Sequence, residues 1–474
     1  MSTDVTLQRN LDSRLLNMIA IGGSIGTGIF LASGNAISLA GPGGTLLAYL
    51  VMGLMVYFLM TSLSEMAAFM PSTGSFYIYG ARFVDPAFGY ALGWNYWYNW
   101  AVTVASEISA ASLIMHFWFP ESSSYIWSAA FLGLVVGFNA ISVRGFGRAE
   151  YWFSFIKVAV IMIFIVAGLA ILFGATHYEA GGFKNWTIGD APFHGGWLAI
   201  ISAFMIAGFS FQGTELIGIA AGESKEPAQS IPRAIKQVFW RILLFFVLSI
   251  FVISLLVPYT AVELVNSDVT TSPFTLVFHQ YGISFAASLI NAVILIAILS
   301  AGNSGMYAAT RMLWYLAKQG HVPRIFSKVN SRGIPMPALV ASTLVAMLTF
   351  LSSLFGSGQV YFWLISASSL SGFIAWLGIA VSHYRFRKAY IAQGLDLNKL
   401  PYVAKGYPYA PLLALALCII VIAGQNYKAF MEQHIDWYGI IISYIGLPLF
   451  ILLWLGYKWM KKTKLVPLQQ CDFT

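Results

Sequence analysis

Near the start of the chain the sequence reads Gly22-Gly23-Ser24-Ile25-Gly26-Thr27-Gly28, in the middle of an apolar run that begins near Leu15. A second interruption, Gly208-Phe209-Ser210-Phe211-Gln212-Gly213-Thr214-Glu215, lies inside a later apolar run. Each glycine in a helix interior costs about 1 kcal/mol relative to alanine. We therefore predict two long helices that are each broken in mid-course.

The composition places the chain in a membrane. Of its 474 residues, 58% are apolar and only 9% are charged, whereas soluble domains run near 45–50% and about 25%. So few charged residues could not cover the surface of a water-soluble protein of this size. We therefore expect the chain to be surrounded by lipid. The two cysteines lie in dissimilar contexts, Cys418 in an apolar run and Cys471 in the terminal tail, and the seven histidines are dispersed. We expect no disulfide, metal centre or cofactor, and no enzyme, since no nucleophile–base spacing occurs.

Apolar runs that cross a bilayer need roughly 20 residues. The sequence has twelve, and each is expected to be helical because exposed irregular backbone is not viable in lipid. They lie near residues 15–40, 44–69, 87–119, 124–142, 150–173, 196–222, 234–257, 284–317, 337–355, 359–384, 408–426 and 437–460. The first is expected to be a retained helix and not a cleaved signal. No polar linker divides the runs, so we predict an all-α membrane protein with a single domain over residues 1–474.

The basic residues orient these helices. With both termini in the cytoplasm, all of the 26 Lys and Arg residues fall in cytoplasmic segments except Lys184, Lys428 and Lys157. The opposite orientation would invert this distribution, so the positive-inside rule favours cytoplasmic termini. The net charge of +8 is therefore a topology signal, and we expect no nucleic-acid partner.

The two glycine-rich interruptions open two sets of five predicted helices, 15–173 and 196–384. Helices eleven and twelve, 408–460, are additions. Gly-interrupted helices at matching positions of two halves are the best sequence indication of an inverted-repeat transporter. Small-residue helix packing could explain one interruption, but not two in equivalent places. A nucleotide-binding loop is excluded because no strand precedes the glycines and no Lys follows them.

A helix broken in the membrane exposes backbone groups that suit a zwitterion. The amides that begin the second half carry partial positive charge and suit a carboxylate. The carbonyls that end the first half suit an ammonium group. We assign the carboxylate side to Ile25, Gly26, Thr27 and Gly28, and the facing wall to Phe209, Ser210 and Phe211. An α-amino acid matches both ends at once.

One predicted helix carries a polar and aromatic stripe. Tyr96, Trp100, Thr103 and Glu107 are spaced i, i+4, i+7 and i+11, which is one face of a helix. Two aromatic rings in register with a carboxylate suit a cationic or amphipathic substrate. The alternative is a packed stripe between helices in which Glu107 is satisfied locally.

Further ionisable residues lie at membrane depth, where they are costly and mark functional sites. Glu215 follows the second interruption and could bind substrate, carry a proton or cap the broken helix. Glu223 lies about 12 Å further along the helix, and it is either a second proton-coupling group or a solvated loop acid. Lys157 could replace a coupling sodium ion if it faces inward, or it could snorkel to the interface. Glu65 is favoured as a structural residue.

At these residues the sequence resembles the amino acid transporter family of the amino acid–polyamine–organocation superfamily, over nearly the whole chain. Its most specific motifs are IAIGGSIGTGIFLASG (19–34), AGPGG (40–44), FSFQGTELIGIAAGESKEP (209–227), IPRA (231–234) and SAGNSGMYAATRML (300–313). Within that family it is most similar to the lysine-specific permease branch, in ALGWNYWYNWAVT (91–103), SVRGFGRAEYWFSFIKV (142–158) and SPFTLVF (272–278).

The resemblance implies a five-plus-five inverted repeat and proton-coupled uptake through a bacterial inner membrane. It also implies that Lys157 occupies the cation-site position on helix five. The matched motifs implicate as substrate or coupling residues Thr27, Tyr96, Trp100, Lys157, Phe209, Glu215 and Glu223.

The resulting hypothesis is a proton-coupled permease that imports a basic amino acid, with lysine as the leading substrate. The outer segment Pro258–Ser272 is shorter and less acidic than the branch implies, so histidine or a neutral amino acid stays open. A channel or a nutrient receptor built on the same helices is the alternative of a different class.

Overall fold

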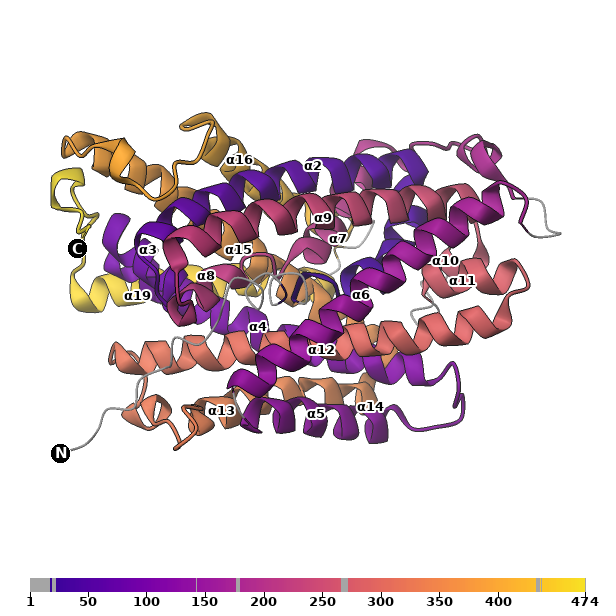
Figure 1. Ribbon diagram of the computed structural model, residues 1–474, viewed down its shortest axis with the longest axis horizontal. Helices are drawn as coiled ribbons and strands as arrows, with labels where there is room; N and C mark the ends of the chain where they lie inside the picture. The colour runs from indigo at the N-terminus through magenta and orange to yellow at the C-terminus, as the bar shows by residue number, and fades with distance from the viewer. Residues whose placement is uncertain are drawn as a thin grey trace.

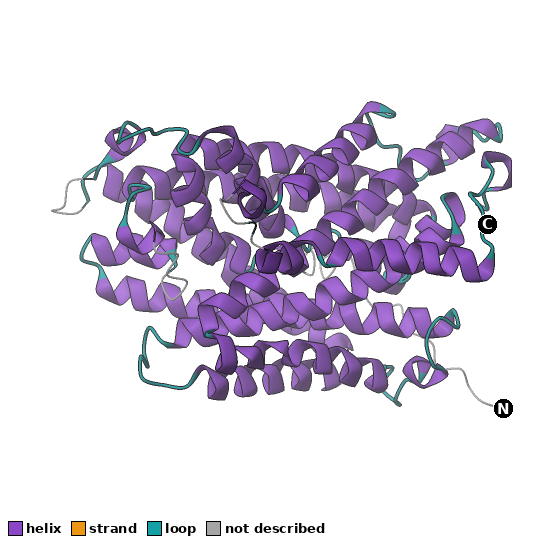
Figure 2. Ribbon diagram, turned by 180° about the vertical axis from the view of Figure 1, so that it is seen from behind, coloured by secondary structure: helices purple, strands orange, loops and turns teal. Residues whose placement is uncertain are grey.

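The structure is a computed structural model that describes residues 18, 23–141, 143–175, 180–265, 272–431, 435 and 437–473. Gly22 of the first glycine-rich stretch lies outside these residues, as do Arg9 and Arg14, two of the N-terminal cations expected in the cytoplasm. In the described part of the chain the secondary structure is helical, with no β-strand (Figure 2). The all-helical prediction is confirmed.

The long helices run along the long axis of the molecule (Figure 1). They are α2 (Ser33–Phe69), α4 (Pro86–Met115), α5 (Ser124–Ile141), α6 (Val143–Leu172), α7 (Gly196–Phe211), α9 (Pro227–Leu256), α12 (Ser284–Lys318), α13 (Met336–Ala346), α15 (Ser357–Ala392), α16 (Tyr409–Gly424) and α19 (Gly446–Lys461). Shorter helices connect or cap them: α3 (Ser75–Phe83), α8 (Leu216–Ala220), α10 (Val262–Val265), α11 (Pro273–Gln280), α14 (Ser352–Phe355), α17 (Lys428–Met431) and α18 (Trp437–Tyr444). Single turns of other helix types are η1 (Gly28–Ala32), η2 (Gly182–Trp186), η3 (Ala221–Glu223), η4 (Arg324–Ser327), η5 (Met347–Leu351), η6 (Leu397–Lys399) and η7 (Leu468–Gln470).

The outer surface of the bundle is apolar, as lipid contact requires. Seven helices among the described residues are long and apolar enough to cross a membrane. On α6, Trp152 and Ile163 are 63% and 59% exposed, while Phe164 on the inner face is fully buried. An isolated exposed apolar residue is common in soluble proteins, but a helix-long apolar face is not. The chain is therefore a multi-pass membrane protein, as its composition predicts.

The first two predicted helices are joined by a very tight turn. Helical structure runs from Ser33 to Phe69 except at Gly41, whose φ of 72° and ψ of 174° produce a kink between two helices. The left-handed φ favours glycine, since a side chain there is strained. The Gly43 and Gly44 amides, freed by the kink, donate to the Pro192 carbonyl at 2.9 and 3.1 Å. The loop before α7 thus satisfies the backbone of this turn.

Four α-helices of the described residues were not predicted from the sequence: the four-residue α10 and α17, and the longer α3 and α11. α3 follows α2, and α11 precedes α12. Both are shorter than the roughly 20 residues that a span needs, so a search for spanning runs does not find them. The last predicted run, 437–460, is divided into α18 and α19, and 337–355 is divided into α13, η5 and α14.

α4 is the centre of one group of helices and α2 of another. α4 packs against α12, α15, α3 and α19, whereas α2 packs against α7 and α9. Both broken helices belong to the α2 group, because the first continues into α2 and the second is α7, and their breaks lie near the middle of the molecule (Figure 1). The residues at the breaks are buried, and this position makes them candidates for a central site.

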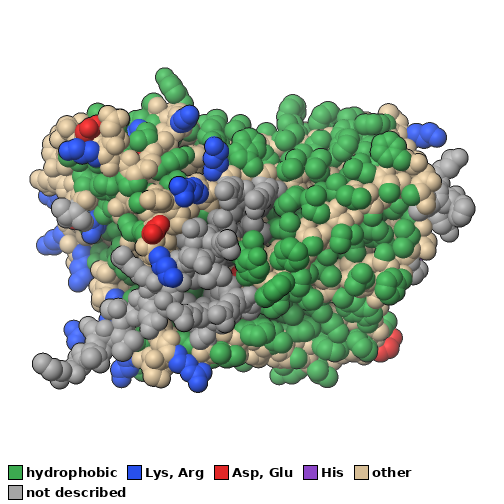
Figure 3. All heavy atoms as spheres, in the orientation of Figure 1, with side chains coloured by type: hydrophobic (Ala, Val, Ile, Leu, Met, Phe, Trp, Pro, Cys, Tyr) green, Lys and Arg blue, Asp and Glu red, His purple; other side chains and the backbone are tan. Residues whose placement is uncertain are grey.

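The basic side chains gather at one end of the molecule, the end that also carries the C-terminal tail (Figures 1 and 3). Hydrophobic side chains cover most of the remaining surface in this view (Figure 3). The tail packs back on the bundle: the Val466 amide donates to the Val84 carbonyl at 2.9 Å. The Phe473 ring lies 5.4 Å from Phe83 and 5.2 Å from Tyr390. These contacts tie the tail to α3 and α15.

Candidate substrate and coupling site

The first helix is interrupted where the glycine pattern predicts. Gly23 and Ser24 are helical, Ile25 and Gly26 form a bend, and helical structure resumes at Thr27. The resumed helix opens as the wide π turn η1, and from there it continues into α2. All of these residues are buried, so the irregular backbone is shielded from lipid by protein, which is the condition for tolerating it in a membrane.

The second interruption lies slightly later than predicted. α7 continues through Phe211 and ends because Gln212 has a ψ of 144°, outside the helical region. Gly213 then takes a φ of +101°, and α8 begins at Leu216. The predicted wall residues Phe209, Ser210 and Phe211 are therefore in the last helical turn, and the break itself spans residues 212–215.

The two breaks touch each other through their backbones. A Cβ atom on Gly213 would lie 2.3 Å from the Gly23 carbonyl oxygen, and one on Gly28 would lie 2.5 Å from the Ser210 Cα. Side chains do not approach backbone so closely, so only glycine fits at both positions. The glycines thus serve two purposes, because they weaken the helices and they let the two broken helices meet.

The α4 stripe faces the first break. Tyr96, Trp100 and Glu107 are at most 3% exposed. The Thr27 hydroxyl donates to Glu107 Oε1 at 3.1 Å, and a Cβ on Gly26 would lie 2.9 Å from the same oxygen. Glu107 Oε2 and the Trp100 Nε1 have no hydrogen-bond partner among the described residues. The stripe therefore offers an acceptor and a donor to a bound molecule.

Glu215 lies in the second break, and its carboxylate accepts two hydrogen bonds. The Gly213 amide and Trp376 Nε1 both donate to Glu215 Oε2, at 3.1 and 3.2 Å. Tyr96 of the stripe lies close enough to interact electrostatically with this carboxylate. The structure therefore joins Glu215 to the stripe on α4, although the two are more than one hundred residues apart in the chain.

Lys157 faces inward and does not snorkel to the interface. Its side chain is fully buried, and its electrostatic neighbours are Glu150 and Glu107. Glu150 is itself buried and accepts a hydrogen bond from the Ser300 hydroxyl at 2.6 Å. A buried cation requires such carboxylates, because desolvation without a partner costs several kcal/mol. Through Lys157 and Glu150, α6 is connected to the stripe on α4 and to Ser300 of α12.

Glu223 lies in a separate cluster and not with Glu215. It is fully buried, and Glu223 Oε1 accepts from the Tyr307 hydroxyl at 2.8 Å and from Arg311 Nε at 3.3 Å. The guanidinium also lies over the Tyr307 ring, 4.2 Å from its centroid. The alternative of a solvated loop acid is wrong. Arg311, counted as a cytoplasmic cation from the sequence, is only 2% exposed.

Glu65 has the structural surroundings that the sequence favours. Arg387 of α15 donates to both of its oxygens, and the Ala404 amide donates to Oε2 at 2.6 Å. His383 Nε2 lies 3.3 Å from the same oxygen. These contacts anchor α2 to α15 and to the loop before α16.

Three aromatic residues of the site were not predicted from the sequence. Tyr361 lies near Thr27 and Glu107, the Tyr49 hydroxyl is 2.8 Å from Ser210 Oγ, and Trp376 binds Glu215. All three are fully buried. A polar aromatic residue inside a spanning run is a weak signal, because many such residues lie at helix interfaces or membrane surfaces.

The profile of the family described as "Amino acid permease" matches residues 16–470. The chain belongs to the amino acid permease family. It is a transporter and not an enzyme.

Relatives in this family extend over the whole chain. The lysine-specific permease LysP of Escherichia coli is 57% identical over 98% of this chain and 96% of its own length. The LysP of Lactococcus lactis is 50% identical over 100% of this chain and 94% of its own. The histidine permease HisP of the same bacterium is 47% identical over 99% and 98%. The family resemblance stated from the motifs is confirmed.

Proposed function

We propose that this permease imports a basic amino acid, with lysine as the leading substrate, and that it couples uptake to protons. The observation that carries the proposal is the meeting of two broken helices at Gly23 and Gly213, beside buried carboxylates on α4 and at the second break. Two relatives are named lysine-specific permeases, which supports lysine. A third is named a histidine permease, which keeps histidine as the second candidate.

The proposed architecture has twelve spans, with inverted repeats at 15–173 and 196–384 and two further helices over 408–460. The breaks at Ile25–Gly26 and at 212–215 support it, since each lies in the first helix of a five-helix set. The short helices α3 and α11 support it too. Each follows the second helix of its set and precedes the third, as expected of two copies of one unit.

The proposed topology has both termini in the cytoplasm of a bacterium, with the protein in the inner membrane. The basic end of the molecule carries the C-terminal tail (Figures 1 and 3). Cytoplasmic segments of membrane proteins are enriched in Lys and Arg. This orientation is therefore supported by where the charges lie in space as well as by where they lie in the sequence.

The substrate's α-carboxylate would bind the backbone at Ile25, Gly26, Thr27 and Gly28. The helix begins again at these residues, and the first amide groups of a helix have no carbonyl acceptor in a preceding turn. Phe209, Ser210 and Phe211 would form the facing wall. The side-chain ammonium of lysine would meet Glu107 Oε2, which lacks a hydrogen-bond partner among the described residues, with Tyr96 and Trp100 alongside as cation–π partners.

Coupling would use Lys157, Glu215 and Glu223. Lys157 lies among Glu107 and Glu150, so its charge state depends on theirs and on the charge of the substrate. Glu215 lies at the second break, where a helix movement would change its contacts. Glu223 pairs with Arg311 and Tyr307 toward the basic end. A proton moved among these groups would change which ion pairs hold the helices together.

Transport requires the site to open, because Thr27, Trp100 and Glu107 are at most 3% exposed here. The helices of one group would rock against the other around the fixed site. A monovalent cation that moves inward gains about 2.3 kcal/mol for each 100 mV of membrane potential. This energy supports a concentration inside that is roughly fifty-fold higher than outside. A coupled proton would raise this limit further.

Uptake of radiolabelled lysine into proteoliposomes, with pH and voltage gradients imposed separately, tests this function. We expect accumulation above the voltage-only limit when both gradients are present, and competition by lysine above histidine and neutral amino acids. No lysine uptake, and no competition by any amino acid, would end the proposal. Ionic conductance without accumulation would indicate a channel instead, and substrate binding without flux would indicate a receptor.

The role of Glu215 has its own test. Glu215→Gln keeps the shape of the side chain but removes its charge and its exchangeable proton. We expect this variant to bind lysine and exchange it across the membrane, but not to accumulate it against a gradient. Glu263→Gln, an exposed acid on α10, is the matched control and should accumulate like the original protein. Normal accumulation by Glu215→Gln would remove the proposed role.

A further inference from the structure

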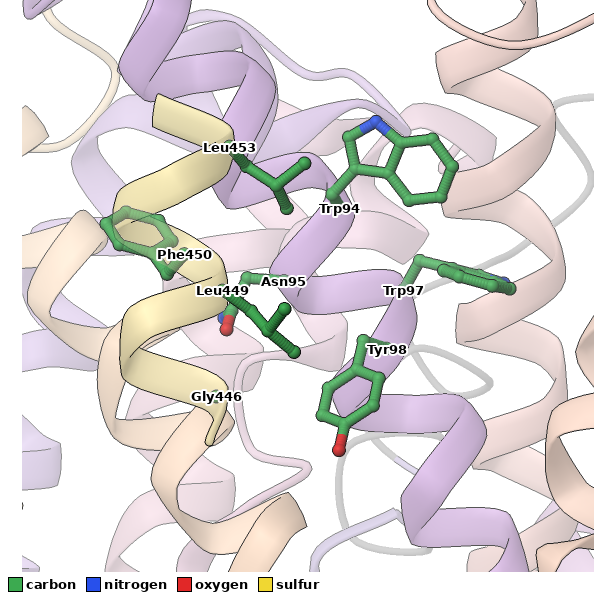
Figure 4. A pocket seen from close by; sticks show the side chains of 8 residues that line it. All are labelled: Trp94, Asn95, Trp97, Tyr98, Gly446, Leu449, Phe450 and Leu453. Atoms are coloured by element: carbon green, nitrogen blue, oxygen red, sulfur yellow. The ribbon is translucent and has the colours of Figure 1, made fainter. Parts of the chain in front are cut away.

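A groove opens on the outer surface of the bundle between α4 and α19. It encloses about 180 Å³, and its lining is mostly apolar. Figure 4 shows Leu449 and Leu453 of α19 facing Trp94 and Tyr98 of α4. The remaining lining residues are Asn95, Trp97, Gly446 and Phe450. Cavities of about 150 Å³ with such linings take up small hydrocarbons, so several methylene groups fit here.

The groove lies directly behind the proposed substrate stripe. Trp94 and Tyr98 are one helical turn apart and share one face of α4. Tyr96 and Trp100 lie two residues further along, which is about half a turn, and they share the opposite face. Whatever fills the groove therefore presses on the helix that carries the stripe.

Lysines stand at the end of α19. Lys461 and Lys462 are exposed, and Lys461 is eight residues beyond Leu453, which is about 12 Å along the helix. Half of a bilayer's hydrocarbon core is about 15 Å thick, so one acyl chain can reach from these lysines into the groove. Lys458, one turn earlier, is already paired with Asp85 at 2.8 Å and fixes this end of α19 against the start of α4.

We propose that the groove binds one anionic phospholipid of the surrounding membrane. An acyl chain lies between α4 and α19, and the phosphate lies beside Lys461 and Lys462. Lipid tails alone gain little by leaving other lipid tails, so selectivity has to come from the charged headgroup. Basic side chains beside a cleft between spanning helices are the recognised chemistry for anionic headgroups.

A second copy of the chain fits this surface less well than a lipid. The space is too small for a helix, and a symmetric pair would bring the two lysine clusters together. Leu452 of α19 is 67% exposed and does not line the groove, so it faces the bulk lipid of the membrane. It therefore provides a matched control for changes inside the groove.

The test uses the purified full-length protein in vesicles that contain a phosphatidylglycerol with a photoactivatable diazirine on its acyl chain. After illumination, labelled peptides are mapped by mass spectrometry. We expect labels concentrated in residues 94–98 and 446–453, and at least five-fold fewer with a phosphatidylcholine probe of the same chain. Leu449→Trp, which fills the groove, should lose this labelling, and Leu452→Trp should keep it.

A second variant separates binding from folding. Lys461→Gln with Lys462→Gln changes only exposed side chains, and it should remove the preference for phosphatidylglycerol over phosphatidylcholine. Equal labelling by both lipids in the original protein, uniform labelling of all lipid-facing helices, or cross-links between two copies through the groove would each overturn the proposal. Labelling does not require transport, so this result is independent of the proposed function.

Discussion

Replacing Gly28 with alanine tests whether the two broken helices must touch. The added Cβ would lie 2.5 Å from the Ser210 Cα and 2.8 Å from its amide nitrogen. Ordinary Cβ contacts begin at 3.4 Å, so α7 has to move by roughly 1 Å. Overpacking of this kind costs about 1–3 kcal/mol. If the closed arrangement is one step of the transport cycle, its population falls by about 5- to 150-fold.

The assay is the initial rate of lysine uptake into proteoliposomes, with the amount of folded protein measured by size-exclusion chromatography. We expect Gly28→Ala to lower the rate by about tenfold or more. Gly137→Ala is the control, because nothing lies within 4 Å of a Cβ at this α5 glycine; it should transport within about twofold of the original protein. A Gly28→Ala protein with an unchanged rate would refute the reasoning, since the helices would then not need this contact.

Two further predictions concern the basic end of the molecule. Phe473→Ala removes ring contacts with Phe83 and Tyr390, worth about 0.5–1.5 kcal/mol for each pair, and should lower the apparent Tm by a few degrees. Phe173→Ala is the control, because this ring is 88% exposed, and it should leave the Tm unchanged. Equal Tm values for the two variants would show that the C-terminal tail does not stabilise the protein. Burial, together with the nearby Lys461, lowers the pKa of His321 below its ordinary value of 6.5. The unfolded chain therefore binds more protons just below pH 6.5, and stability falls as the pH drops through that range. The apparent Tm between about pH 7.5 and 5.5 should fall less for His321→Gln, and an equal fall would exclude this contribution.

Local sequence features were sufficient for much of this protein. Apolar run length predicts the all-helical membrane fold, because every span must satisfy its own backbone hydrogen bonds. Glycine content predicts where two helices break, to within a few residues. The spacing from Tyr96 to Glu107 predicts a shared face of α4, because helical periodicity is a property of the backbone alone.

The partners of the ionisable residues were decided only by tertiary structure. Whether Lys157 snorkels or faces inward depends on the orientation of α6. Glu150 lies on the same helix, but Glu107 of α4 becomes an electrostatic neighbour of Lys157 only in the packed bundle. Arg311 carries charge in a region that the charge rule counts as cytoplasmic, yet packing buries it against Glu223. Tyr361 and Trp376 enter the site from α15, more than two hundred residues from the first break. Hydropathy and periodicity describe one segment at a time, whereas ion pairs and glycine contacts arise between segments distant in the chain, and these become defined when the helices pack.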